Sequence, residues 1–130
     1  MSVTISSEHA AQIIATADAH PDIEICGLLV GSYNRIDDIL PAANVADDTT
    51  RRFEIDPAVL FGALRSERAG GGVLIGNYHS HPGGGGTPSE TDAAMIRKPG
   101  ELWLIVARGE LSAWRANADM RFDHVALILA

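Results

Sequence analysis

Hydrophobic positions along the chain follow helical spacing in some stretches and strand spacing in others, which predicts a mixed α and β domain. Residues 7–19 carry apolar side chains at helical spacing, after a serine cap at Ser6 or Ser7. A second helix is expected from Asp56-Pro57 to about residue 68, with Asp56 as its cap. Apolar runs predict strands at residues 3–5, 23–31, 34–43, 51–55, 73–78, 102–107, 111–115 and 124–129.

The stretch with the clearest chemistry follows the run at residues 73–78. Two histidines, His79 and His81, lie two positions apart, so that a strand would place both side chains on one face. A four-glycine loop comes next, and then a helix start with Ser89 as N-cap and Asp92 at its third position. Two imidazoles and one carboxylate, with a fourth position left to water, make a ligand set for a catalytic zinc. The alternative is a surface loop in which Asp92 only favours its helix N-terminus.

The whole string from His79 to Asp92 resembles the JAMM motif, also called MPN+, of zinc-dependent isopeptidases and peptidases. That motif reads H-[ST]-H, seven residues, S-x-x-D, and residues 82–88 supply the seven here. The resemblance implies one Zn²⁺ per chain held by His79, His81 and Asp92, with the Ser89 hydroxyl beside the developing oxyanion. It also implies an α/β fold, a mixed sheet flanked by helices, similar to cytidine deaminases. Deaminase activity itself is disfavoured, because a chain with one cysteine lacks the Cys-x-x-Cys pair of those zinc sites.

Glu24 has two interpretations. It stands near the start of the apolar run 23–31, where an exposed glutamate at a strand start needs no function. The JAMM resemblance favours a second role, since members of that family carry their catalytic glutamate in a similar string: Glu, two residues, Gly, then aliphatic residues ending in Gly. Residues 24–31 follow this pattern, which implies that Glu24 is the general acid and base.

Five other residues whose side chains could have a functional role are interpreted as structural. Cys26 lies inside an apolar strand, where a single cysteine is usually a small core residue. Trp103 and Trp114 are expected to pack in the core or on the sheet. We interpret His9 as an exposed helix residue and His124 as a structural residue at the start of the last strand.

Composition and charge narrow the possible classes of protein. The 130 residues suit a single domain over 1–130, and 46% hydrophobic with 21% charged residues is typical of a globular chain. The net charge of -7, without a Lys/Arg cluster, argues against a nucleic-acid partner. The N-terminus resembles no signal peptide, and no apolar run reaches membrane-spanning length. We therefore expect a cytoplasmic protein with no membrane partner.

The resemblance leaves three functions open. The first is a zinc metallopeptidase or isopeptidase that cleaves after the Gly-Gly tail of a ubiquitin-like or sulfur-carrier protein (ThiS/MoaD-like β-grasp). This chain looks most like compact prokaryotic members, because it has no long ubiquitin-gripping insertion. The second is a RadC-type domain associated with DNA repair, which usually has a His-x-His-Pro-Ser-Gly loop and a DNA-binding part that are absent here. The third is a non-enzymatic MPN scaffold, disfavoured by the intact ligands and base.

Overall fold

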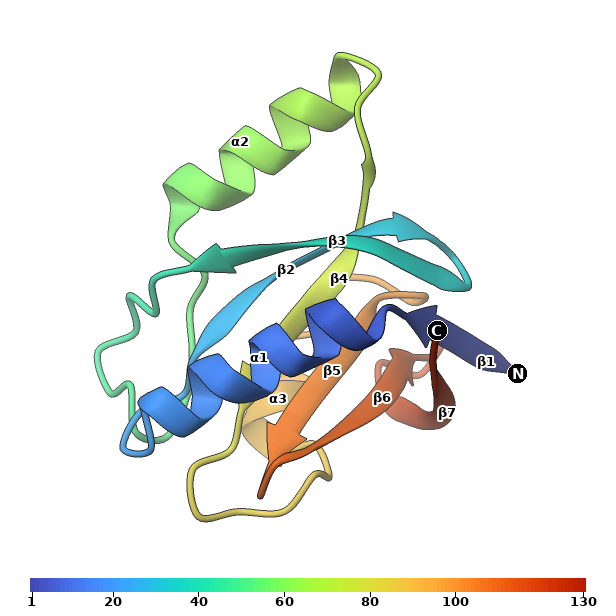
Figure 1. The fold of residues 1–130 in the computed structure, drawn as a ribbon. Coiled ribbons are helices and arrows are strands. Elements are labelled where there is room, and N and C mark those ends of the chain that lie inside the picture. The colour runs from blue at the N-terminus through green and yellow to red at the C-terminus, as the bar shows by residue number, and fades with distance from the viewer.

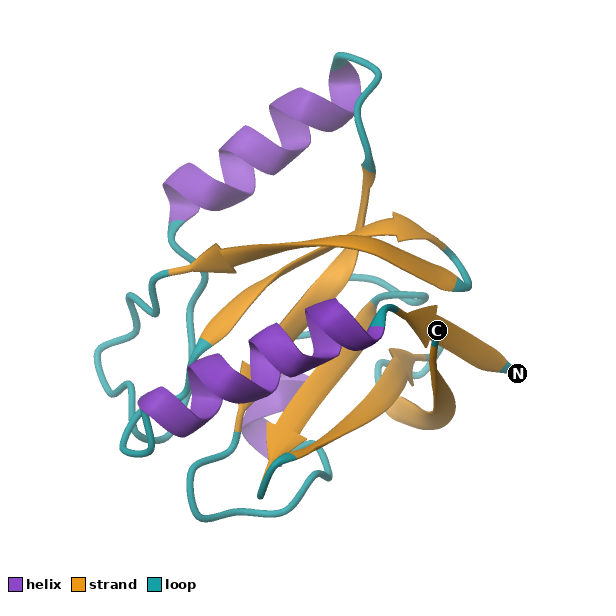
Figure 2. Ribbon diagram, in the orientation of Figure 1, coloured by secondary structure: helices purple, strands orange, loops and turns teal.

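Seven strands and three helices make up the fold in a computed structural model that describes residues 1–130 (Figures 1 and 2). In chain order the elements are β1 (Ser2–Ile5), α1 (Ser7–Ala19), β2 (Cys26–Ser32), β3 (Arg35–Ala42), α2 (Pro57–Arg68), β4 (Val73–Ser80), α3 (Glu90–Ala94), β5 (Leu102–Ala107), β6 (Glu110–Ala116) and β7 (Phe122–Leu129).

The strands form one mixed sheet that closes into a barrel in the order β1-β3-β2-β4-β5-β6-β7. β4 is parallel to β5, and β1 is parallel to both of its neighbours, whereas the remaining pairs are antiparallel. β1 pairs with β7 over four positions but meets β3 only where Thr4 faces Arg35. The expected mixed sheet with flanking helices is confirmed, and the closure by β1 is an additional feature.

Side-chain alternation divides the interior into two cores. In β5, Leu102, Leu104 and Val106 join a core of 14 buried residues to which α1 contributes Ala10 and Ile13. Trp103 points the opposite way, into a core of five buried residues that also contains Phe53 and Ile96. In Figure 1, α1 crosses in front of the sheet and α3 lies behind it. β4 and β5 therefore present one apolar face to α1 and a second face to the candidate site.

One predicted strand is wrong, and another begins later than expected. Residues 51–55 form no strand, and only Ile55 makes an isolated bridge, to Asn44. The backbone N–H groups of Arg51 and Arg52 instead donate to Asp48 in a turn. The strand expected from residue 23 begins at Cys26, so Glu24 lies in the preceding loop. The N–H of Glu24 donates to Thr49 at 2.8 Å rather than to a neighbouring strand.

The predicted helix starts are confirmed in detail. Ser6 caps α1 by accepting from the N–H of His9 at 3.0 Å, and Asp56 caps α2 by accepting from Ala58. His9 is half-buried rather than exposed, and its ring lies 3.6 Å from the carboxylate of Asp38. No helix in the structure combines the length and the apolar character needed to cross a membrane.

Candidate metal centre

The end of β4 sets the position of the two histidines. β4 lies between β2 and β5, so His79 is fully buried opposite Cys26 on one side and Ile105 on the other. Phe53 stacks on the His79 ring at 4.4 Å between centroids, and Trp103 meets it edge-on at 5.6 Å. His81 follows the last residue of β4, and its ring still turns toward that of His79. Packing therefore fixes the His79 imidazole before any metal binds.

Three potential metal donors converge at this point. The two histidine Nε2 atoms are 2.9 Å apart, Nε2 of His79 is 3.2 Å from Oδ1 of Asp92, and Nε2 of His81 is 3.0 Å from Oδ2. Two ligands that each bind a tetrahedral zinc at 2.0–2.1 Å lie about 3.3 Å from each other. The observed separations are close to that value, so His79, His81 and Asp92 form a group that could hold a metal ion.

The short helix α3 aims the carboxylate of Asp92. Ser89 caps the helix by accepting from the N–H of Asp92 at 3.0 Å, and Oδ2 of Asp92 accepts from the N–H of Ser89 at 2.9 Å. The cap at Ser89 is confirmed, and the bond returned by the Asp92 carboxylate completes a capping box. Because the Ser89 hydroxyl oxygen accepts that bond, its own hydrogen remains available for a substrate.

The glycine loop orients His81. Its Nδ1 lies 2.8 Å from the carbonyl oxygen of Gly85, which can only accept, so Nδ1 carries the hydrogen. In the neutral ring this leaves the lone pair on Nε2, the atom that faces Asp92 and His79. A backbone carbonyl of the loop thus selects the tautomer that leaves Nε2 free to coordinate a metal ion.

The pKa shifts of Asp92 and His79 favour the protonation states that bind metal, whereas that of His81 favours the charged ring in the metal-free protein. Burial lowers the pKa of His79, which keeps the ring neutral, despite the opposing bond to Asp92. Burial raises the pKa of Asp92, but hydrogen bonds from His79 and His81 outweigh it and hold the pKa well below its usual range. For His81, burial lowers the pKa and the bond to Asp92 reverses this, so the net direction is upward. Asp92 is therefore ionised and His79 neutral, the forms that coordinate metals.

Glu24 faces this group from the loop before β2. It is 5% exposed, and its Oε1 is buried without a hydrogen-bond partner. Burial raises its pKa to about 7, with a smaller lowering by the charge of His81 and a raising by Asp92. A carboxylate with this pKa can both take and return a proton near neutral pH. Cys26, two residues on, is 3% exposed, and burial raises its pKa to about 12, which agrees with the predicted core role.

Several residues around the centre could not be found from the sequence. Phe53 was placed in a strand, but its ring covers His79. Asn44 donates through Nδ2 to the carbonyl of Glu24 at 2.8 Å from 20 residues away. The two tryptophans pack as expected, Trp103 against His79 and Trp114 against His124 at 4.9 Å. These contacts join segments that are far apart in the sequence, so no local sequence pattern predicts them.

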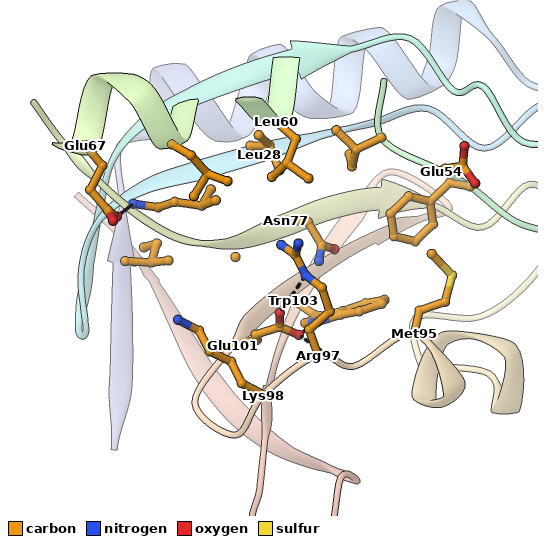
Figure 3. A pocket seen from close by; sticks show the side chains of 16 residues that line it. Leu28, Glu54, Leu60, Glu67, Asn77, Met95, Arg97, Lys98, Glu101 and Trp103 are labelled. Atoms are coloured by element: carbon orange, nitrogen blue, oxygen red, sulfur yellow. Dashed lines mark hydrogen bonds and ion pairs between the residues drawn. The ribbon is translucent and has the colours of Figure 1, made fainter. Parts of the chain in front are cut away.

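A cavity of about 480 Å³ lies beneath α2, and none of His79, His81, Asp92 and Glu24 lines it (Figure 3). The side chains of Leu28 and Leu60 lie on one wall, and those of Asn77 and Trp103 on the opposite wall. Asn77 occupies the same face of β4 as His79, and its Oδ1 is buried without a partner. Phe53 and Trp103 line the cavity and also contact His79, so its inner end adjoins the candidate metal centre.

Comparison with proteins of known sequence identifies relatives over most of the chain. A desampylase from Haloferax volcanii is 33% identical over 106 residues, which cover 79% of this chain and 76% of that protein. A desampylase from Pyrococcus furiosus is 26% identical over 129 residues, 98% of this chain and 91% of that protein.

Solved structures show the same fold. A protein from Desulfitobacterium hafniense superposes with a TM-score of 0.81 at 26% identity, over 98% of this chain and 92% of that one. A JAB1/MPN domain protein from Archaeoglobus fulgidus matches with a TM-score of 0.60 at 21% identity, over 98% of this chain and 99% of that one. The family model for prokaryotic homologs of the JAB domain matches residues 6–117. The chain therefore belongs to the prokaryotic JAB (JAMM-type) family and is a JAMM-type hydrolase.

Proposed function

We propose that the protein is a zinc-dependent isopeptidase that hydrolyses the amide bond after the Gly-Gly tail of a ubiquitin-like or sulfur-carrier protein. The observation that carries this proposal is the convergence of His79, His81 and Asp92 beside a glutamate whose pKa is about 7. The two relatives named desampylase support it, because that name describes removal of a ubiquitin-like modifier.

The residues of the chain divide the reaction between them. His79, His81 and Asp92 would hold one zinc ion, which when bound supplies Lewis-acid activation of water and of the scissile carbonyl. Glu24 takes the proton from the attacking water and passes it to the leaving nitrogen, a transfer suited to a pKa near 7. The Ser89 hydroxyl donates to the carbonyl oxygen as negative charge develops there. These roles follow the motif resemblance, and each is part of the proposal.

The cavity beneath α2 is a suitable place for the substrate tail. Its largely apolar walls suit an extended chain, and two of its lining residues, Phe53 and Trp103, contact His79. The unpaired Oδ1 of Asn77 can accept an N–H from the backbone of such a chain. Two terminal glycines suit a narrow approach to the metal centre, because they carry no side chain.

The test uses a β-grasp carrier protein linked through its terminal glycine to a lysine side chain. The zinc-loaded protein should release the carrier with an intact Gly-Gly end, as measured by mass spectrometry. A matched conjugate with valine in place of the last glycine should show a kcat/KM at least about 10²-fold lower, since misplacing the scissile bond by about 1 Å has a cost of that size. Equal rates on the two conjugates would refute the narrow approach and favour a general peptidase. No cleavage of either conjugate would refute the isopeptidase proposal.

A further inference from the structure

Ser80, the residue between the two histidines, has no part in the metal centre described above. Strand alternation directs its side chain away from the face that carries His79. It is nevertheless only 4% exposed, and its hydroxyl makes contacts with the segment that carries Glu24. The Ser80 hydroxyl therefore bonds to the Glu24 segment rather than to the metal centre.

Ser80 bonds to the residue before Glu24 and to the residue after it. The N–H of Ile25 donates to Oγ of Ser80 at 2.8 Å, and the same Oγ lies 3.4 Å from the carbonyl oxygen of Ile23, to which it donates. The N–H of Ser80 donates to the carbonyl of Ile25 at 3.0 Å. In a regular antiparallel pair the N–H of Ile25 would return to the backbone carbonyl of Ser80. Here the Ser80 hydroxyl accepts the bond from the N–H of Ile25, the residue that follows Glu24.

The side chain of Glu24 depends on its backbone for position. Its Oε1 has no hydrogen-bond partner, so no direct bond at that atom holds the carboxylate. The backbone is anchored by Thr49, by Asn44 and, through its two neighbours, by Ser80. Thr49 and Asn44 lie in the segment between β3 and α2, whereas Ser80 belongs to β4, the strand that also carries His79. Ser80 is thus the anchor that joins the glutamate to the strand of a candidate ligand.

We propose that Ser80 is a positioning residue, which sets the location of Glu24 relative to the metal ligands by bonding to Ile23 and Ile25. Its catalytic consequence rests on the proposed function, because Glu24 must act on the reacting water for its position to affect turnover. The anchoring itself is a property of the chain and can be measured without substrate.

The experiment compares Ser80→Val with Ser80→Thr, two variants of equal shape that differ in the hydroxyl, alongside Ser80→Ala. Hydrogen exchange of the Ile25 amide by NMR should be slow in the wild type and in Ser80→Thr, and at least about tenfold faster in Ser80→Val and Ser80→Ala. In the zinc-loaded protein the same two variants should lose about 10- to 100-fold in kcat, the cost of a catalytic group displaced by about 1 Å. KM and zinc content should stay as in the wild type. Ser6→Ala, which removes a comparable bond at α1, should leave both the Ile25 exchange rate and kcat unchanged.

A second comparison isolates the route through Glu24. In a Glu24→Gln background, Ser80→Val should cause little further loss of kcat, because the group that it positions no longer transfers protons. A loss of the same factor in both backgrounds, or a Ser80→Val protein with wild-type kcat, would overturn the inference. If Ser80→Ala does not fold, the valine and threonine pair decides. If the wild type cleaves no conjugate, the proposed function fails, and the Ile25 exchange rate still decides whether Ser80 anchors this segment.

Discussion

The two faces of the sheet differ in what their buried side chains do. Toward α1 lies a core of 14 buried hydrophobic residues drawn from all seven strands and the helix. On the face that carries Trp103, the core has five buried residues and borders the buried polar groups His79, Asp92 and Glu24. The first face holds the fold by apolar packing. The second places polar groups in an environment that shifts the pKa values of all three.

This division separates stability from chemistry. Substitutions on the α1 face should lower the free energy of unfolding and leave the chemistry of folded molecules intact. Substitutions on the metal face should reduce activity with little loss of stability, because buried polar groups contribute less to folding than the apolar residues opposite.

Leu104→Ala should produce the largest change in stability. Leu104 is fully buried in the larger core, and such a truncation costs about 2–5 kcal/mol through lost packing and the cavity left behind. Urea unfolding followed by circular dichroism measures this loss. The kcat of the molecules that remain folded should match the wild type, and a kcat reduced tenfold or more would show that the two faces are coupled.

Glu24→Gln should lower activity rather than stability. The variant keeps the shape of the side chain but cannot transfer protons, so kcat should fall by roughly 10²-fold or more while zinc content and KM hold. Stopped-flow or discontinuous assays with a carrier conjugate provide the measurement. Undiminished turnover would show that Glu24 has no catalytic function, which is the alternative interpretation.

The pH dependence of stability offers a test without substrate. The pKa of Glu24 is about 7 in the folded protein against an ordinary 4.5, so between these pH values the folded state retains a proton that the unfolded chain has lost. Stability from this group is therefore complete below pH 4.5 and declines as the pH rises to 7, by about 2–3 kcal/mol. In metal-free protein, Glu24→Gln should escape this decline. An identical pH profile for the variant and the wild type would contradict the pKa shift.

Local sequence patterns predicted much of this arrangement. The N-cap at Ser89 with Asp92 at the third helical position and the alternation of His79 and His81 are encoded within a few residues, and both occur as expected. Glu24 lies outside its expected strand, where its N–H bonds to Thr49 and that of its neighbour Ile25 bonds to Ser80, and only the folded chain brings these residues near. The closure of the barrel by β1 against β7 likewise joins the two ends of the chain, so no local periodicity reports it.

The smallest effect is expected in the glycine loop. A Cβ at Gly85 would meet no atom within 4 Å, so Gly85→Ala should change the free energy of unfolding by less than about 0.5 kcal/mol. By restricting the loop whose carbonyl binds His81, it should still lower kcat several-fold. Gly83→Ala is the matched comparison, because a φ of +68° there should cost about 1 kcal/mol. A kcat unchanged in Gly85→Ala would show that the backbone freedom of residue 85 does not affect catalysis.

The most direct measurement of the central claim is the zinc content of the purified protein. Mass spectrometry under native conditions and elemental analysis should find about one zinc per chain, the stoichiometry of three protein ligands with one open position. His81→Ala should lose tight binding yet keep the circular dichroism of a folded domain, because the larger core does not include the proposed metal ligands. A wild-type protein that neither retains zinc nor binds it on titration would contradict the account.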